Sequence, residues 1–399
     1  MTELNRRKML IVSGGATLLG AMGMAQPAWA WSPSGSVAGA GAGTDPKWVW
    51  DAEADPVVAA MLDRGEVAAV NQALRTWTRN DQPTPSGLPP DLREFVEHAR
   101  RLPSWADQSK LDAAADFMKV SGRFVNLLNG LGGGMLSTAI PNEARAVYYS
   151  KGGADMKDRV AKTAKLGYDV GSLNAYRPDG QMIVSAVKTR LVHAAVRHLL
   201  PQSPHWQQGI PISQNDMLVT WHTLPTYTMR KLTDWRVRVS SAHSAAYLHS
   251  WQVTGHMLGI RDEYLPSTWD AAHAQSKQVL DPAMGPTREG VELTDILLDM
   301  LAEQTSPGRA DRPMVNALAR HIIGDRFSEW NGIPREPIWD PLVGTAFPAL
   351  VAFHEKLIPL PLVPQAAWVL DEAIRRYIRL WLSEGRPVNI EIPDMNRPS

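Results

Sequence analysis

The chain of 399 residues contains no cysteine. It can therefore form no disulfide, and it offers neither a thiolate nucleophile nor a thiolate ligand for a metal. Covalently attached c-type haem is excluded as well, because that attachment needs a Cys-x-x-Cys-His segment. The fold must be held by packing, hydrogen bonds, ion pairs or a group that binds without covalent bonds.

An excess of charge of either sign is also lacking. Lys plus Arg and Asp plus Glu number 41 each, so the formal net charge is zero. Proteins that bind nucleic acid carry a basic surface for the phosphates, and we therefore expect no nucleic-acid partner. Beyond the N-terminal segment, no stretch reaches the about 18 uninterrupted apolar residues that a transmembrane helix needs. We expect no membrane span in the mature protein.

Several catalytic and binding motifs are missing. No Gly-x-Ser-x-Gly elbow is present, which argues against an α/β-hydrolase. His354-Glu355 is not followed by the second histidine of a zincin. The glycine cluster at residues 129–134 lacks the lysine of a phosphate loop, and it would allow a helix break or a close approach to a flat ligand. His249 and His256 could share a helix face as a metal pair, or serve as two unrelated histidines.

The N-terminus has the anatomy of an export signal. The pair Arg6-Arg7 precedes a glycine-interrupted apolar run and a small-residue cleavage site. This order predicts a twin-arginine (Tat) signal peptide over residues 1–30, with an ordinary secretion signal as the alternative. Ser, Gly and Ala then dominate, which predicts a flexible leader over residues 31–50. Residues 51–399 are expected to form a single domain, secreted to the extracellular space.

Apolar residues recur at helical spacing through most of the chain. The segment at residues 370–382, LDEAIRRYIRLWL, is plainly amphipathic. Short β-like stretches such as residues 217–221 do not alternate for long, and no internal repeat of fixed period is present. The pattern predicts an all-α fold.

Two neighbouring helical segments carry polar groups that an apolar core normally avoids. On the first, Arg159, Lys162 and Thr163 share one helical face. On the second, His193 stands in a run of Val, Leu and Ala. Such a histidine would suit a buried cofactor that needs an axial imidazole ligand, although a hydrogen-bonded core histidine fits the same pattern. Its Nδ1–H could reach the carbonyl of Thr189 and leave Nε2 free to bind a metal.

Glu143 follows Pro141-Asn142 at the start of another expected helix. The helix dipole favours a carboxylate there, so N-terminal capping is one explanation. The other is that Glu143 faces an apolar cavity. Desolvation would then raise its pKa and make it a competent base near neutral pH.

Three strings of residues connect these segments with a known family. They are PNEARAVYYS from Pro141, KDRVAKTAKLGYDVG from Lys157 and VKTRLVHAAVRHLLP from Val187. Together with residues 211–217, 219–222 and 251–266, these strings resemble the latex clearing proteins. Those are secreted rubber oxygenases with b-type haem, within a wider group of MpaB-like oxygenases.

The resemblance implies a globin-like helical core with additional helices and one non-covalent haem b. It implies that O2 cleaves the double bonds of cis-1,4-polyisoprene, which gives oligo-isoprenoids with aldehyde and ketone ends. His193 would be the proximal haem ligand, and Lys162 a distal ligand that caps the iron in a closed state. Arg159 and Thr163 would accompany Lys162 in the distal motif, and Glu143 would be the catalytic base.

Two further expectations concern the cofactor and the partners. Arg190 and Arg197 lie one turn on either side of His193, and this spacing suggests that they bind the haem propionates. We expect a monomer. Two alternatives stay open: an oxygenase of the same family that acts on another isoprenoid or lipid alkene, and a secreted haem-binding protein without turnover.

Overall fold

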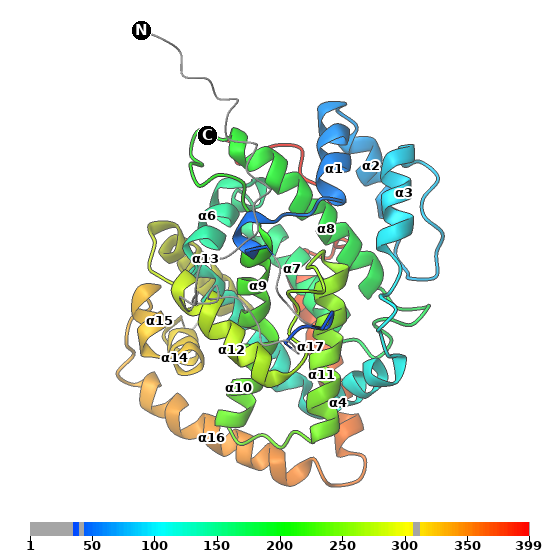
Figure 1. The fold of residues 1–399 in the computed structure, drawn as a ribbon. Helices are drawn as coiled ribbons and strands as arrows, with labels where there is room; N and C mark the ends of the chain where they lie inside the picture. The colour runs from blue at the N-terminus through cyan, green and yellow to red at the C-terminus, as the bar shows by residue number, and fades with distance from the viewer. Residues whose placement is uncertain (1–34, 40–43, 306–311, 399) are drawn as a thin grey trace, which may run out of the picture.

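The structure, a computed structural model, describes residues 35–39, 44–305 and 312–398 (Figure 1). Within these ranges the secondary structure is helical apart from isolated β-bridges, which confirms the all-α prediction. No helix in the described ranges is long and apolar enough to cross a membrane. The signal peptide predicted for residues 1–30 lies outside the described residues.

The α-helices are α1 (Ala54–Asp63), α2 (Val67–Arg75), α3 (Pro90–Ala99), α4 (Gln108–Leu127), α5 (Gly134–Thr138), α6 (Pro141–Tyr149), α7 (Met156–Val170), α8 (Met182–Leu199), α9 (Gln214–Trp221), α10 (Tyr227–Asp234), α11 (Ser241–Met257), α12 (Trp269–Val279), α13 (Arg288–Thr305), α14 (Arg312–Ile323), α15 (Asp325–Trp330), α16 (Trp339–Leu357) and α17 (Val363–Leu382). Two π-helical segments, η2 (Leu128–Gly133) and η5 (His222–Thr226), and four 3-10 turns, η1 (Pro46–Trp48), η3 (Lys151–Gly153), η4 (Leu200–Gln202) and η6 (Asp281–Ala283), connect them.

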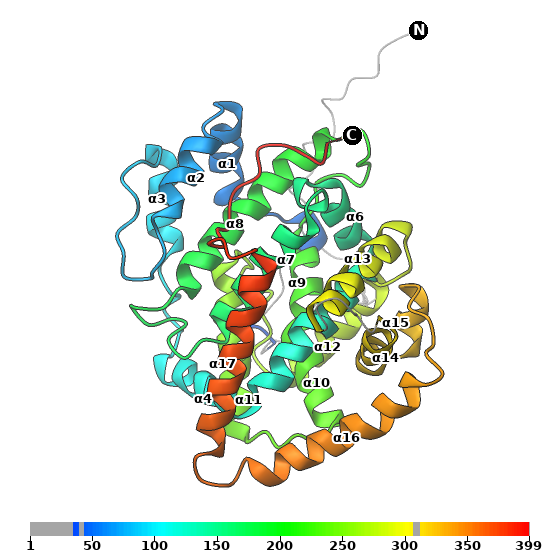
Figure 2. The ribbon, with the colours of Figure 1, turned by 180° about the vertical axis from the view of Figure 1, so that it is seen from behind.

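Helices α4, α8 and α11 form the interior of the molecule. α11 packs along α4 and also contacts α8, while α8 is covered by α1 on one side and by α7 on another. α17 lies against α4 and α7, and α16 lies against α14 along the lower edge (Figures 1 and 2). Two large apolar clusters result, one centred on α4, α10 and α11 and the other on α1, α3 and α8. Val170 and Leu258 pack against both clusters and so join them.

The helices that matter for the site begin at recognisable caps. α6 starts with Pro141, whose ring already has a helical φ and whose missing N–H is not needed in the first turn. The carboxylate of Asp155 accepts the backbone N–H of Asp158 at 3.0 Å and starts α7. Ser213 and Asp216 form a capping box at the start of α9. That box explains why residues 217–221, which have β-like composition, are helical instead.

The glycine cluster allows two π-helical segments to pack closely. η2 contacts η5, and a Cβ added to Gly132 would lie 2.9 Å from Cε1 of Tyr227. A Cβ on Gly133 would lie 2.8 Å from Cδ2 of Leu224. Any larger residue would force the two segments apart. The cluster therefore does not break the helix but changes it to π geometry, and its close neighbours are side chains of the protein.

The described parts of the leader are docked, which differs from the flexible segment expected over residues 31–50. The backbone N–H of Val37 donates to the carbonyl of Leu265 at 2.9 Å. The carbonyl of Val49 accepts the backbone N–H of Gln214 at 2.8 Å. These bonds use main-chain groups, which every residue carries. A composition rich in Ser, Gly and Ala could therefore not reveal them.

The C-terminal residues bind across three elements that lie far from them in sequence. Asn71 of α2 exchanges two hydrogen bonds of 2.9 Å with the backbone of Ile392. The side chain of Asn396 donates to the carbonyl of Leu199 at 2.6 Å, at the end of α8. The backbone N–H of Arg397 donates to the carbonyl of Tyr149 at 3.1 Å, at the end of α6. The tail thereby ties α6 to α8 and α2.

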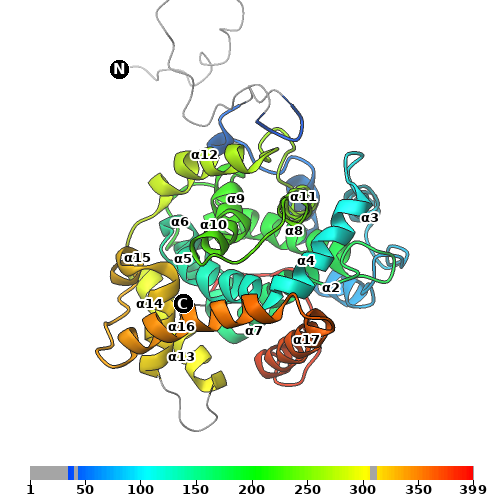
Figure 3. The same cartoon turned by 90° about the horizontal axis from the view of Figure 1, so that it is seen from below.

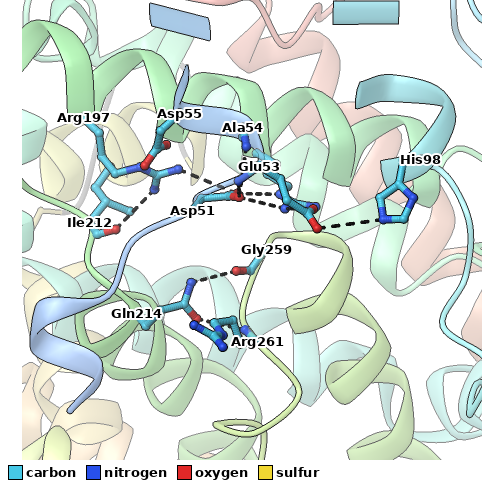
Figure 4. A network of polar contacts seen from close by, with 11 residues as sticks. Asp51, Glu53, Ala54, Asp55, His98, Arg197, Ile212, Gln214, Gly259 and Arg261 are labelled. Atoms are coloured by element: carbon cyan, nitrogen blue, oxygen red, sulfur yellow. Dashed lines mark hydrogen bonds and ion pairs between the residues drawn. The ribbon is translucent and has the colours of Figure 1, made fainter. Parts of the chain in front are cut away.

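A buried ion-pair network joins α1 to α8 (Figure 4). Nε and Nη2 of Arg190 donate to the two carboxylate oxygens of Asp51 at 2.5 and 2.8 Å. Nε of Arg197 donates to Asp55 at 2.7 Å, and its Nη2 lies 3.8 Å from Asp51. The side chains of Asp51 and Arg197 are each only 5% exposed. Burial alone would raise the pKa of Asp51, but the hydrogen bonds and charges of Arg190 and Arg197 lower it overall.

Gly259 completes this network by leaving room for it. Its φ is +93°, and an added Cβ would lie 2.6 Å from Oδ2 of Asp51 and 2.8 Å from Nε of Arg190. Its carbonyl accepts the side-chain amide of Gln214 at 2.8 Å. Only glycine satisfies both the backbone conformation and the space. The network thus also fixes the loop after α11 and the start of α9.

Replacing Asp51 with Asn should lower the free energy of unfolding by about 3–5 kcal/mol, because it leaves two buried guanidinium groups without their shared partner. The matched change Glu53→Gln removes a carboxylate whose side chain is 56% exposed. It should cost no more than about 1 kcal/mol. Urea unfolding followed by circular dichroism measures both. If both variants lost equally little free energy of unfolding, Asp51 would not be the main anion of the network.

Candidate functional site

His193 lies near the middle of α8 as a neutral imidazole. Burial, followed by the positive charges of Arg197 and Arg159, lowers its pKa to about 3. The ring is therefore uncharged at physiological pH, which is the form that binds metals. Its Nδ1 is buried and has no hydrogen-bond partner among the described residues. The bond expected from Nδ1–H to the carbonyl of Thr189 is therefore absent.

Glu143 lies in the first turn of α6, but its carboxylate is turned toward α9. Oε1 accepts a hydrogen bond from Oγ1 of Thr220 at 2.5 Å. Burial raises its pKa to about 8, the Thr220 hydroxyl and Arg159 lower it, and Asp216 adds to the increase. The N-terminus of α6 has no side-chain capping bond. The carboxyl of Glu143 is therefore desolvated and does not cap α6, while its role as a base stays a prediction.

Arg159 of α7 connects these two groups. Burial lowers its pKa, and the charge of Glu143 opposes that effect. Its own charge lowers the pKa of both Glu143 and His193, so the three side chains share one electrostatic environment. Gly152 of η3 gives the arginine its space, because a Cβ there would lie 2.9 Å from Cδ of Arg159. The structure thus brings together Glu143, Arg159 and His193 from α6, α7 and α8.

Desolvation is the largest cause of the pKa shift of both Glu143 and His193, although both residues are partly accessible by surface area. The charge of Arg159 acts on each of them as well. A neutral imidazole and a carboxyl with a raised pKa are therefore coupled through one guanidinium group.

Lys162 and Thr163 lie on α7 without a described contact to the other residues of the site. Nζ of Lys162 pairs with the carboxylate of Asp158 at 2.6 Å, one turn earlier on α7. Thr163 is exposed. No described contact joins either of them to His193. Their distal roles stay predictions, as does the capping of the iron by Lys162.

Arg190 and Arg197 have protein carboxylates as partners. As Figure 4 shows for Arg197, the network with Asp51 and Asp55 occupies the guanidinium group. Arg190 is bound by Asp51 and Glu53. The binding of propionates by these arginines stays a prediction, and such propionates would compete with the carboxylates of the α1 segment. The charge of Arg197 nevertheless reaches His193 and lowers its pKa.

Three residues of the site carried no assigned role in the sequence. Thr220 donates to Glu143, Asp216 acts on it through charge, and Gly152 makes room for Arg159. The capping pattern Ser213-x-x-Asp216 could have located the start of α9. Nothing in the sequence marks Thr220 as the partner of a residue 77 positions away.

His249 and His256, which could have formed a metal pair, each bind a group of the protein instead. Nε2 of His249 accepts the backbone N–H of Asp107 at 2.9 Å. Nδ1 of His256 lies 2.7 Å from the carboxylate of Asp262. Among residues 35–39, 44–305 and 312–398, no group of three or more His, Asp and Glu side chains could hold a metal ion.

Comparison with known proteins gives concordant results. Residues 118–355 match the family model described as ER-bound oxygenase mpaB/B′ and rubber oxygenase, catalytic domain. The chain is 58% identical to a rubber oxygenase from Streptomyces sp. (strain K30) over the full length of both proteins. It also matches the structure of a latex clearing protein in its closed state, with a TM-score of 0.82 and 60% identity over 92% of this chain and all of the other. The matched segment contains Glu143, Arg159 and His193. The chain therefore belongs to the family of mpaB/B′ and rubber oxygenases.

Proposed function

We propose that the protein is a dioxygenase that cleaves the double bonds of cis-1,4-polyisoprene with O2. The products would be oligo-isoprenoids with aldehyde and ketone ends. The proposal is supported by the rubber oxygenase that is 58% identical over the full chain. The observation that carries it is Glu143, a desolvated carboxyl with a pKa of about 8 that shares the charge of Arg159 with a neutral His193.

Haem b is the cofactor in this proposal. The surroundings of His193 fit it, because its imidazole is neutral and its buried Nδ1 has no partner among the described residues. His193 would hold the iron as the proximal ligand. A bound haem supplies the iron at which dioxygen is activated.

Glu143 has the properties of a base toward an allylic C–H bond. With a pKa of about 8, roughly one tenth of it is ionised at pH 7. It would accept a proton from the allylic carbon of the bound isoprene unit at Oε. Arg159 stabilises the ionised form through its charge, and the Thr220 hydroxyl fixes the orientation of the carboxylate. The low polarity that raises its pKa also suits a hydrocarbon substrate.

Secretion through the Tat pathway is part of the proposal. It rests on the twin arginine and the cleavage site within residues 1–30. An insoluble polymer cannot enter a cell, so an enzyme that cleaves it must reach the outside. We propose that the mature enzyme acts there as a monomer.

A second candidate keeps the chemistry and changes the substrate. The family model covers ER-bound mpaB/B′ oxygenases as well as rubber oxygenases, so another isoprenoid or lipid alkene is an alternative substrate. Assays of latex beside small terpenoids, read as carbonyl-ended products, distinguish the two. A haem protein without turnover would consume no oxygen when latex is added.

His193→Ala should abolish haem binding, because no other axial ligand lies at that point of α8. The visible spectrum and the pyridine haemochrome of purified protein measure the haem content. His198→Ala is the matched control on the same helix, since its ring lies 3.2 Å from Asp63 with 25% of the side chain exposed. The control should keep its haem. A His193→Ala protein with an unchanged Soret band would rule out the axial-ligand role.

Glu143→Gln should keep the haem and lower the rate of cleavage by about 100-fold or more, which is the usual contribution of a general base. In the wild type the rate should rise with pH up to about 8, because only the ionised carboxylate accepts a proton. The variant should lack this rise. Oxygen uptake with latex between pH 6 and pH 9 measures both. A variant with full activity would remove Glu143 from the mechanism.

Thr220→Val should move the rising part of the pH profile upward by about 0.5–1 unit. The change removes a hydrogen bond that favours the ionised carboxylate, and such a bond contributes about 0.5–1.5 kcal/mol. Thr223→Val is the control, because that hydroxyl donates to the carbonyl of Thr220 and not to Glu143. Thr220→Ser should restore the wild-type profile. A profile that does not move in Thr220→Val would contradict the role of the hydroxyl.

A further inference from the structure

A long segment near the C-terminal end of the chain has almost no charge. From Pro341 to Leu370 only Glu355 and Lys356 are charged, whereas 21% of the whole chain is charged. The segment covers most of α16, the loop that follows it and the first part of α17. We call the outward surface of residues 338–380 the α16–α17 flank.

The flank exposes most of the large apolar side chains found on the described surface. Of 16 exposed large hydrophobic residues in the described ranges, 11 lie between residues 338 and 380. Leu362 is 83% exposed, Phe353 60% and Leu380 60%. Single exposed apolar residues are normal on a protein surface, but a cluster of this size marks a surface that binds something.

α17 distributes its side chains unusually for a surface helix. Two of its charged residues, Asp371 and Arg375, are turned inward, where their side chains are 6% and 5% exposed, whereas Glu372 and Arg376 remain toward solvent. Leu370, Ile374 and Tyr377 face outward, each about half exposed. Burial of charge and exposure of apolar surface both cost free energy in water. Such a helix is suited to contact with an apolar medium on its outer side.

Apart from Lys356 in its last turn, the outer side of α16 carries no charge along most of its length. Between Pro341 and His354 no Lys, Arg, Asp or Glu occurs, and only Phe347, Val351 and His354 of this stretch are buried. Glu355 is turned toward Arg238, whose Nε lies 2.9 Å away. Figure 3, the view from below, shows α16 on the outside of the molecule.

These features indicate that the partner of the flank is a broad apolar surface and not a second copy of the chain. A partner helix covers a stripe about 100° wide, and charged residues along its borders set the register. On α16 the exposed apolar positions extend well beyond such a stripe, and Pro348 lies within the helix. A second helix would leave much of this surface in water, whereas an uncharged hydrocarbon phase would cover all of it.

The flank is also connected with the candidate site. α17 packs against α7, the helix that carries Arg159 and Lys162, and Nζ of Lys157 lies 4.7 Å from the ring centre of Trp381. We propose that the α16–α17 flank adsorbs the enzyme to the surface of solid polyisoprene particles. The inference rests on the proposed function and adds to it a place where the insoluble substrate is bound.

The test uses the mature holoenzyme and the double variant Leu350→Glu/Phe353→Glu. Anaerobic sedimentation with latex particles measures adsorption without turnover. The variant should adsorb at least ten-fold more weakly, because each glutamate would be transferred from water to hydrocarbon. Oxygen uptake with latex should fall in parallel, whereas uptake with a short oligo-isoprenoid in detergent should be unchanged. Ile210→Glu/Met395→Glu is the control, since both residues are 50% exposed and lie outside the flank.

A second variant, Leu370→Lys/Ile374→Lys on α17, allows the same measurement if the first variant does not fold. Circular dichroism and the haem spectrum verify the fold of both variants. Wild-type adsorption by both folded variants would overturn the inference. So would a wild-type dimer that the variants break without a change in adsorption, or equally tight binding to neutral phosphatidylcholine vesicles. Absence of oxygen uptake with every alkene would refute the proposed function instead, while anaerobic adsorption would still test the flank.

Discussion

The position of α8 depends on the carboxylate of Asp51. α8 is buried along most of its length and carries both arginines of the network as well as His193. Two guanidinium groups in an apolar interior are tolerated only with an anionic partner, and Asp51 serves both. The same carboxylate requires glycine at position 259 and thereby fixes the loop after α11. The imidazole of His193 is held in place by an ion pair made one turn away from it.

Electrostatics and burial divide the site into groups with different tasks. Burial keeps His193 neutral and Glu143 largely protonated at neutral pH, so neither opposes the approach of an uncharged substrate. Arg159 supplies the one positive charge that acts on both, and it favours the ionised form of Glu143. A carboxyl with a pKa near 8 is thereby held beside a guanidinium group that favours its ionised form.

Much of the fold could be predicted from residue patterns, and the reasons for the failures are physical. Helical periodicity predicted the amphipathic helix at residues 370–382, which the structure extends to Val363. It could not show that Asp371 and Arg375 of α17 face the core, because periodicity fixes the separation of two faces and not which face meets the core. Glu143 could be singled out by its place in the sequence, and burial raises its pKa as expected, while its role as a base stays a prediction. The partners of Arg190 could not be found, since Asp51 is 139 positions away. The docked part of the leader relies on main-chain bonds, which have no signature in composition.

The C-terminal tail has a consequence for the order in which the site is completed. α6 carries Glu143, and its last turn is held by Arg397, about 250 residues further along the chain. At about 5–20 residues per second, the ribosome needs roughly 10–50 s to reach that residue after α6 has been made. During this interval α6 lacks the contact that ties its end to the tail. The last turn of the helix that carries Glu143 is therefore secured only after Arg397 has been made, and the final position of the carboxyl is a late result of folding.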